Sequence, residues 1–218
     1  NATEKAQSRS ALILAITLPR PAMLTRLLDH PMIDPNIRHA SRCTPLIQCV
    51  LDDDMKAFSS LVAHAALKVD ARDSGLRSAL SHAVALGRSA MAHALLSRGA
   101  DVNLADGKGM FPLHHAQDEA MVLELVNNGA DLDAVDKKGK SAVVLNVELG
   151  KESMVTYMML LGADVDVKSK ALEKASLFRP LDVRLRLLNV LIEQSKVSTE
   201  TEESEVLDIA GFTKATVK

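Results

Sequence analysis

Apolar residues recur along the chain at the three- and four-residue intervals of short amphipathic helices. One stretch carries two such groups, which are Leu80, Ala83 and Val84 followed by Met91, Ala94, Leu95 and Leu96. Gly87 lies between the groups and predicts a turn, so the stretch reads as two short helices with a tight connection. A single helix pair cannot bury its apolar faces alone, and we therefore predict that successive pairs stack on one another.

Three copies of the tripeptide Gly-Ala-Asp divide the chain at regular intervals. They begin at Gly99, Gly129 and Gly162, with spacings of 30 and 33 residues. A second set of landmarks keeps the same register, since five residues separate Asp73, Asp106 and Asp136 from Ser78, Phe111 and Ser141, respectively. Glycine adopts the left-handed backbone of a helix end more easily than any other residue, so we predict that second helices end at the three Gly-Ala-Asp glycines.

A six-residue motif occurs three times in this register. Its copies are Phe111-Pro112-Leu113-His114-His115-Ala116, Ser78-Ala79-Leu80-Ser81-His82-Ala83 and Thr44-Pro45-Leu46-Ile47-Gln48-Cys49. Thr44 and Ser78 are suited to cap a helix, and Pro45 is suited to its first position. With Gly-Ala-Asp, the motif resembles the ankyrin repeat, whose signature is Thr-Pro-Leu-His-x-Ala on a period near 33 residues.

The resemblance extends upstream of these copies. Ser10-Ala11-Leu12-Ile13-Leu14-Ala15 lies 34 residues before the Thr44 motif and reads as a degenerate first repeat. Because this segment fits the repeat register, we prefer a repeat to the alternative of a signal peptide around the apolar stretch Ala11–Leu18.

The resemblance implies an all-α fold, an ankyrin-repeat α-solenoid of about five to six helix-turn-helix units with short β-hairpin fingers. We expect an N-terminal extension at 1–9 and a repeat domain at 10–194. The expected units are 10–38, 39–72, 73–105, 106–135, 136–168 and a capping helix pair at 169–194. The Ser/Thr-rich acidic tail at 195–218 has two alternatives, docking on the body or remaining solvated.

The unit at 106–135 departs from the pattern because it is three residues short. Alignment places the loss between its two helices, after Gln117 and before Asp118. We expect a shallow notch there. In the unit at 39–72, the Asp52-Asp53-Asp54 run occupies the turn between the helices and reads as a solvated acidic turn.

Composition and charge narrow the function. The formal net charge is −2, and aromatic residues make up 2% of the chain with no Trp. Near-neutral charge and few stacking side chains argue against a nucleic-acid or other polyanion binder. The two cysteines, Cys43 and Cys49, cannot build a disulfide scaffold, which favours a reducing compartment. We expect Arg42, beside Cys43, to lower the pKa of that thiol.

Catalytic and metal-binding patterns are not apparent. Gly107-Lys108-Gly109 has no Lys-Ser/Thr after it and so is no phosphate loop. His114 and His115 are adjacent, and adjacent helical side chains point about 100° apart, which disfavours a shared ion. In the repeat resemblance, His114 would instead bridge backbone groups between neighbouring fingers. We therefore predict no enzyme activity, no cofactor and no metal.

The resemblance implies that a partner meets the finger residues and the exposed face of the first helices. In this register, the candidate partner-binding residues are Arg42, Ser74, Arg77, Leu86, Lys108, Met110, Lys137, Lys138 and Lys140. Their cations, without an acid among them, favour an acidic peptide or acidic protein surface. Asn103 resembles an asparagine that is hydroxylated in some ankyrin repeats, with a structural role in its turn as the alternative.

We thus expect a non-enzymatic scaffold or adaptor, monomeric as an isolated domain, that binds another protein through the concave finger side. The alternative is a regulatory or targeting module of a larger enzyme, channel or effector protein, which a first residue Asn1 rather than Met favours. A cytoplasmic location is expected, with the nucleus or a host-cell cytosol as alternatives. No apolar stretch is long enough to predict membrane insertion.

Overall fold

The computed structural model of the chain describes residues 11–12, 14–15, 21–28, 30, 33–38 and 43–163. The chain divides into two compact units, Asn1–Asp131 with Val135–Lys138 and Leu132–Ala134 with Gly139–Lys218, which we call the first and second units. The expected N-terminal extension, the capping pair at 169–194, the tail at 195–218 and Arg42 lie outside the described residues. The expected repeat boundaries stay predictions.

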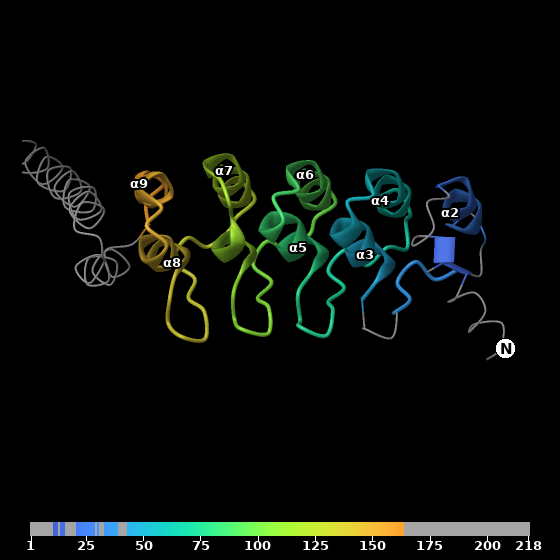
Figure 1. The fold of residues 1–218 in the computed structure, drawn as a ribbon, viewed down its shortest axis with the longest axis horizontal. Coiled ribbons are helices and arrows are strands. Elements are labelled where there is room, and N and C mark those ends of the chain that lie inside the picture. The colour runs from blue at the N-terminus through green and yellow to red at the C-terminus, as the bar shows by residue number, and fades with distance from the viewer. Residues whose placement is uncertain are drawn as a thin grey trace, which may run out of the picture. The chain divides into compact units, whose positions relative to one another are not determined.

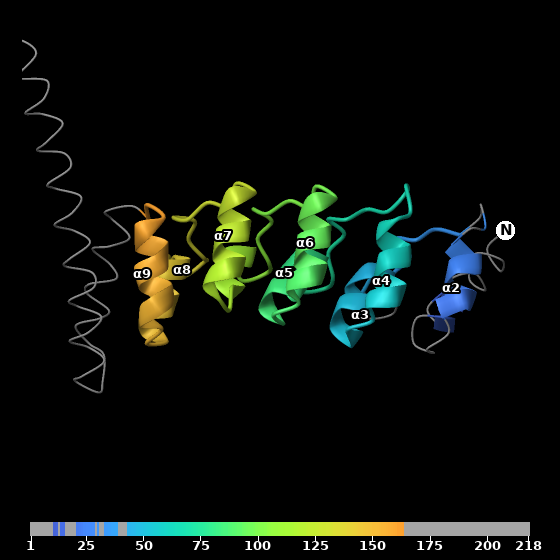
Figure 2. The ribbon, with the colours of Figure 1, turned by 90° about the horizontal axis from the view of Figure 1, so that it is seen from above.

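The first unit is built from short helices in two layers (Figures 1 and 2). Its elements are α2 (Pro21–Leu28), α3 (Pro45–Asp52), α4 (Met55–Val62), α5 (Ala79–Ala85), α6 (Ser89–Ser97), the 3-10 helix η1 (Pro112–His115) and α7 (Glu119–Asn127). In the inner layer, α5 packs against α3 on one side and η1 on the other. In the outer layer, α4 packs against α2 and α6. This arrangement confirms the predicted stacking of helix pairs.

The second unit contains α8 (Ala142–Glu148) and α9 (Glu152–Leu160), which pack against each other as an inner and outer pair. Val143, Val147, Val155 and Met158 are fully buried in this unit. This pair of helices matches the helix-turn-helix unit that the repeat register predicts for this part of the chain.

Side-chain caps fix where the inner helices begin. The hydroxyl of Thr44 accepts a hydrogen bond from the Ile47 N–H at 3.3 Å, and that of Ser78 accepts one from the Ser81 N–H at 3.2 Å. The predicted N-caps are therefore confirmed. The predicted left-handed ends of the outer helices are also confirmed, with φ of 78°, 87° and 99° at Gly99, Gly129 and Gly162.

The acidic run at 52–54 lies where α3 meets α4, with Asp52 and Asp53 exposed to solvent and Asp54 half-buried. Asp53 adopts a left-handed backbone at the end of α3 and forms an ion pair with Arg88. The carboxylate of Asp54 caps α4 by accepting hydrogen bonds from the N–H groups of Lys56 and Ala57. The run thus ends one helix and starts the next.

The three missing residues shorten an inner helix. The 3-10 helix η1 has 4 residues, whereas α5 has 7. Asp118 must begin α7, where its carboxylate accepts the Met121 N–H at 2.8 Å, so the chain crosses to the outer layer after one turn. The Gln117 side chain then donates to the Ala85 carbonyl at the end of α5, at 2.6 Å. The deficit falls within the first helix rather than in the connection after Gln117.

Candidate functional site

The finger loops of the first unit are folded around aspartate side chains. One oxygen of Asp73 accepts the N–H groups of Gly75 and Arg77, at 2.8 and 2.9 Å. In the next finger, one oxygen of Asp106 accepts the N–H groups of Lys108 and Met110, at 2.8 and 2.9 Å. The predicted hairpin closes with a single antiparallel bridge between Arg72 and Ser78. The aspartates therefore shape the loops that present the candidate binding residues.

The second oxygen of each aspartate meets a histidine from the following inner helix. His82 Nε2 lies 2.8 Å from Asp73, and His115 Nε2 lies 3.5 Å from Asp106. Burial alone would raise the pKa of Asp73, but hydrogen bonds from the His82 side chain and from backbone N–H groups lower it below its ordinary value. The pKa of Asp106 is likewise lowered, because the Met110 and Lys108 N–H groups and His115 outweigh burial.

Arg77 completes a partly buried polar cluster with Asp106 and His115. Its Nε lies 4.0 Å from Asp106 Oδ2, and the exposed fractions of the two side chains are 28% and 5%. Burial, and then the positive guanidinium of Arg77, lower the pKa of His115 to about 4. His115 is therefore neutral at neutral pH, and Asp106 is charged. The side chain of Arg77 is directed to its neighbouring finger as well as to solvent.

Hydrogen bonds between fingers hold the loops in register. The Gly107 N–H donates to the Gly75 carbonyl at 2.8 Å, and the Lys137 N–H donates to the Lys108 carbonyl at 3.1 Å. The Lys137 ammonium donates to the Gly107 carbonyl at 2.7 Å. This bond fixes the position of the Lys137 ammonium, and its acceptor is a neutral carbonyl rather than a carboxylate.

The structure brings most of the candidate finger residues together on consecutive loops of the first unit. Ser74, Lys108, Lys137 and Lys138 are exposed, and Met110 is half-buried. Neither the Lys108 nor the Lys138 ammonium forms an ion pair within the described residues. Leu86 is 47% exposed but lies at the far end of α5, about 12 Å along the helix from its N-cap.

Lys140 and Arg42 are not counted in this group. Lys140 belongs to the second unit, where its ammonium lies 2.6 Å from a carboxylate oxygen of Glu148. Arg42 is outside the described residues. We therefore define the finger surface as Ser74, Arg77, Lys108, Met110, Lys137 and Lys138, with Leu86 apart from it at the far end of α5.

Asn103 links two successive repeats. Its side-chain N–H donates to the Gly129 carbonyl at 2.8 Å, and its oxygen accepts the Asp131 N–H at 3.1 Å. Asn36 makes the same pair of bonds to the Ala66 carbonyl and the Lys68 N–H two repeats earlier. The structural alternative for Asn103 is thus present, and its hydroxylation stays a prediction.

His114 and the cysteines have local roles. His114 Nδ1 accepts the Phe111 N–H at 3.2 Å, which caps its own 3-10 turn, while the expected bridge between fingers stays a prediction. The expectation of a low pKa at Cys43 is wrong, because burial and then Asp73 and Asp52 raise it to about 11. Burial, followed by Asp54 and Asp52, raises the pKa of Cys49 to about 12. Both thiols are free and protonated at neutral pH.

Within the part of the chain that the structure describes, no three His, Cys, Asp or Glu side chains come together as metal ligands would. In the same residues, no helix has the length and apolar character needed to cross a bilayer.

The aspartate–histidine pairs were missed by sequence reasoning, although a signal for them exists. Asp73 and His82 are nine residues apart, and so are Asp106 and His115. This repeated interval places the histidine one turn inside the inner helix, facing back toward the finger. Arg77, by contrast, reaches an aspartate of the next repeat, and only the stacking of repeats brings those two together.

Comparisons with known proteins agree with this architecture. The family model described as ankyrin repeats (3 copies) matches residues 12–106, and that described as ankyrin repeat matches residues 108–137. The chain belongs to the ankyrin-repeat family. Ankyrin repeats are generally protein-interaction modules and are typically not enzymes.

Individual relatives were found both by sequence and by structure. The chain is 30% identical over 85% of its length to the neurogenic locus notch homolog protein 2 of Homo sapiens and of Mus musculus, and it spans 8% of those curated relatives. The crystal structure of the ankyrin repeat domain of Bcl-3, a member of the IkappaB family, is similar with a TM-score of 0.74, 26% identity and coverage of 84% of this chain and 85% of that chain. The ankyrin repeat protein EF0377 has a TM-score of 0.71 at 21% identity, covering 84% and 96%, which shows the fold alone.

Proposed function

We propose that this chain is a non-enzymatic scaffold whose finger surface binds an acidic segment of a partner protein. The observation that carries the proposal is that Lys108 and Lys138 are exposed on consecutive fingers, beside Lys137. Such a positive surface attracts carboxylates and steers an acidic partner toward the fingers. Met110 and Leu86 offer apolar contact on the same unit.

The positions of the finger aspartates support this proposal. Asp106 is 5% exposed at its side chain, and Asp73 accepts hydrogen bonds from its own loop and from His82. The two carboxylates therefore bond to groups within the fingers and the inner helices, while the lysine charges remain at the surface. Because exposed cations are screened by salt, we expect binding to weaken as ionic strength rises.

The test is a charge reversal on the first unit. The probe is a blocked peptide of alternating Glu and Leu residues, titrated into the full chain and followed by calorimetry at low and high salt. We expect Lys108→Glu/Lys138→Glu to weaken binding about tenfold at low salt and to flatten its salt dependence. A double variant that binds the peptide as tightly as the parent chain would overturn the assignment.

A matched control removes the effect of net charge. Lys56 and Lys68 are exposed outside the finger surface, so Lys56→Glu/Lys68→Glu makes the same charge change elsewhere. The control variant should bind the peptide as the parent does, and circular dichroism should show equal helix content in all three proteins. Equal losses in both double variants would mean that only overall charge matters.

A second candidate is that the repeats serve as a regulatory or targeting module of a longer protein. The short share of the curated relatives that this chain spans, 8%, favours it. The size of the native protein, measured by immunoblot with an antibody to this chain, tests it. For either candidate we propose a cytoplasmic location and a monomeric repeat domain, which fractionation and sedimentation would check.

A further inference from the structure

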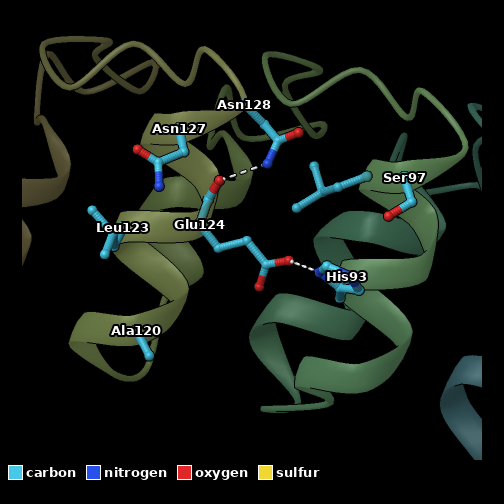
Figure 3. A pocket seen from close by; sticks show the side chains of 8 residues that line it. His93, Ser97, Ala120, Leu123, Glu124, Asn127 and Asn128 are labelled. Carbon is cyan, nitrogen blue, oxygen red and sulfur yellow. Dashed lines mark hydrogen bonds and ion pairs between the residues drawn. The ribbon is translucent and has the colours of Figure 1, made fainter.

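A groove of about 370 Å³ lies between the outer helices α6 and α7, both in the first unit (Figure 3). Its apolar wall is formed by Leu96, Ala120 and Leu123. Ala120 is exposed, and Leu123 is 39% exposed, so apolar surface faces solvent here on an outer layer. The finger loops of this unit extend from the inner layer, away from these outer helices (Figure 1). The groove is therefore separate from the finger surface.

The polar groups of the groove favour a cation. Glu124 projects between the two helices, where one carboxylate oxygen lies 2.7 Å from His93 Nδ1 (Figure 3). The other oxygen has no hydrogen bond among the described residues. Ser97 and Asn127 add a hydroxyl and an amide oxygen, which accept hydrogen bonds. No lysine or arginine lines the groove.

Among the described residues, His93 is the basic group that contacts this carboxylate, and it meets one of the two oxygens. Arg98, which follows α6, donates its guanidinium to the His64 carbonyl of the preceding repeat at 3.1 Å. The Glu124 side chain is 24% exposed, whereas His93 is 74% exposed. A partly buried carboxylate in an apolar groove binds a cation more strongly than one in open solvent, because screening is weaker there.

We propose that this groove binds a segment of a partner protein that presents an arginine next to an apolar residue. The guanidinium donates to the free oxygen of Glu124, and the arginine stem lies along the apolar wall at Leu123. Arginine suits the site better than lysine because its planar group can donate two parallel hydrogen bonds to a carboxylate, here that of Glu124. The volume accommodates one such side chain and part of its neighbour.

The second contact would make the chain a bridge between two partners, an acidic one at the fingers and a basic one at the outer helices. The groove proposal does not depend on the finger proposal, since the two use different residues and opposite charges. Failure of one leaves the other in place, because an arginine peptide tests the groove and an acidic peptide tests the finger surface.

The probe is the blocked tripeptide acetyl-Ala-Arg-Leu-amide, titrated into the full ¹⁵N-labelled chain by NMR. We expect saturable shifts at the backbone amides of Ser97, Leu123 and Asn127, with none at Lys108 or Lys138 of the finger surface. The same peptide with citrulline in place of arginine keeps the shape but loses the charge, and it should bind about tenfold more weakly.

Two variants of α7 form the matched pair. Glu124→Gln removes the groove carboxylate and should weaken binding of the arginine peptide about tenfold or more. Glu119→Gln makes the same charge change in the first turn of the same helix, outside the groove lining, and should leave binding unchanged. Retained amide dispersion in both spectra would show that both variants fold.

Four results would overturn the proposal. They are no shifts at the groove amides at millimolar peptide, equal binding of the citrulline peptide, equal losses in the two variants, and groove shifts produced by concentrating the chain alone. The last result would mean that the groove is occupied by a second copy of this chain.

Discussion

At the scale of single residues, Leu76 has an unfavourable backbone conformation at the tip of its finger. Its φ of 59° lies in the left-handed region, where Gly109 and Gly139 stand at the same position of later fingers with φ of 78° and 71°. A side chain with a Cβ is disfavoured in that region by about 1–2 kcal/mol. Leu76 is 47% exposed, so burial does little to offset the strain.

Replacing Leu76 by glycine should therefore stabilise the protein. We expect Leu76→Gly to raise the free energy of unfolding by about 0.5–1 kcal/mol, since relief of the left-handed strain exceeds the extra chain entropy of glycine. Urea unfolding followed by circular dichroism measures the change. Leu76→Ala keeps the Cβ and serves as the control. If the glycine variant is no more stable than the alanine variant, backbone strain at Leu76 is not significant.

At the scale of elements, the fingers depend on a close approach of two backbones. The Gly107 N–H bonds the Gly75 carbonyl, and a Cβ on Gly107 would lie only 2.8 Å from that oxygen. A Cβ on Gly75 would meet the Asp73 carboxylate at 3.3 Å, which is a milder contact. The two glycines joined by this hydrogen bond thus differ in how strongly an added side chain would destabilise the fold.

Alanine substitution should reveal this difference between the two glycines. We expect Gly107→Ala to lower the free energy of unfolding by about 1–3 kcal/mol, because the contact must separate and the hydrogen bond lengthens. Gly75→Ala should cost less than about 1 kcal/mol. Urea midpoints of the two variants test the prediction, and a larger loss for Gly75→Ala would contradict the register of the fingers.

The 3-10 helix η1 shows what a length deficit does to an element. The sequence indicates that three residues are missing, and it places the loss close to Gln117. The outer layer determines which element is shorter by these residues. Asp118 caps α7, so the chain must reach the outer layer by that residue. The inner helix η1 is therefore the element that is shortened, and the Gln117 side chain that follows it donates to the Ala85 carbonyl at the end of α5.

At the scale of the molecule, the polar cluster beneath the fingers links stability to pH. The pKa of His115 is about 4 in the folded chain against an ordinary value of 6.5. An unfolded chain therefore takes up a proton at this histidine at a higher pH than the folded chain does. Its contribution to stability is complete above pH 6.5 and is lost as the pH falls toward 4. The lowered pKa of Asp73 and of Asp106 adds a further loss at lower pH, below the ordinary value of 3.8.

We expect the free energy of unfolding to fall by about 2–3 kcal/mol between pH 7 and pH 4.5 through His115. Urea unfolding at several pH values across this range measures the fall, and the His115→Gln variant, which cannot titrate, should show a smaller slope. A variant with the same slope as the parent chain would mean that His115 does not retain its low pKa in the folded state.

Local features of the fold follow from the sequence, and contacts between repeats follow only from the tertiary structure. Thr44 and Ser78 cap helices through N–H groups three residues away, and Gly99 ends a helix through its own backbone, so short motifs determine these features. The pairing of His93 with Glu124 joins residues 31 apart, and Arg77 meets Asp106 across two fingers. Such pairs depend on how the repeats stack. The sequence thus determined the repeat register and the candidate cations, whereas the stack decided which charges are paired and which remain exposed for a partner.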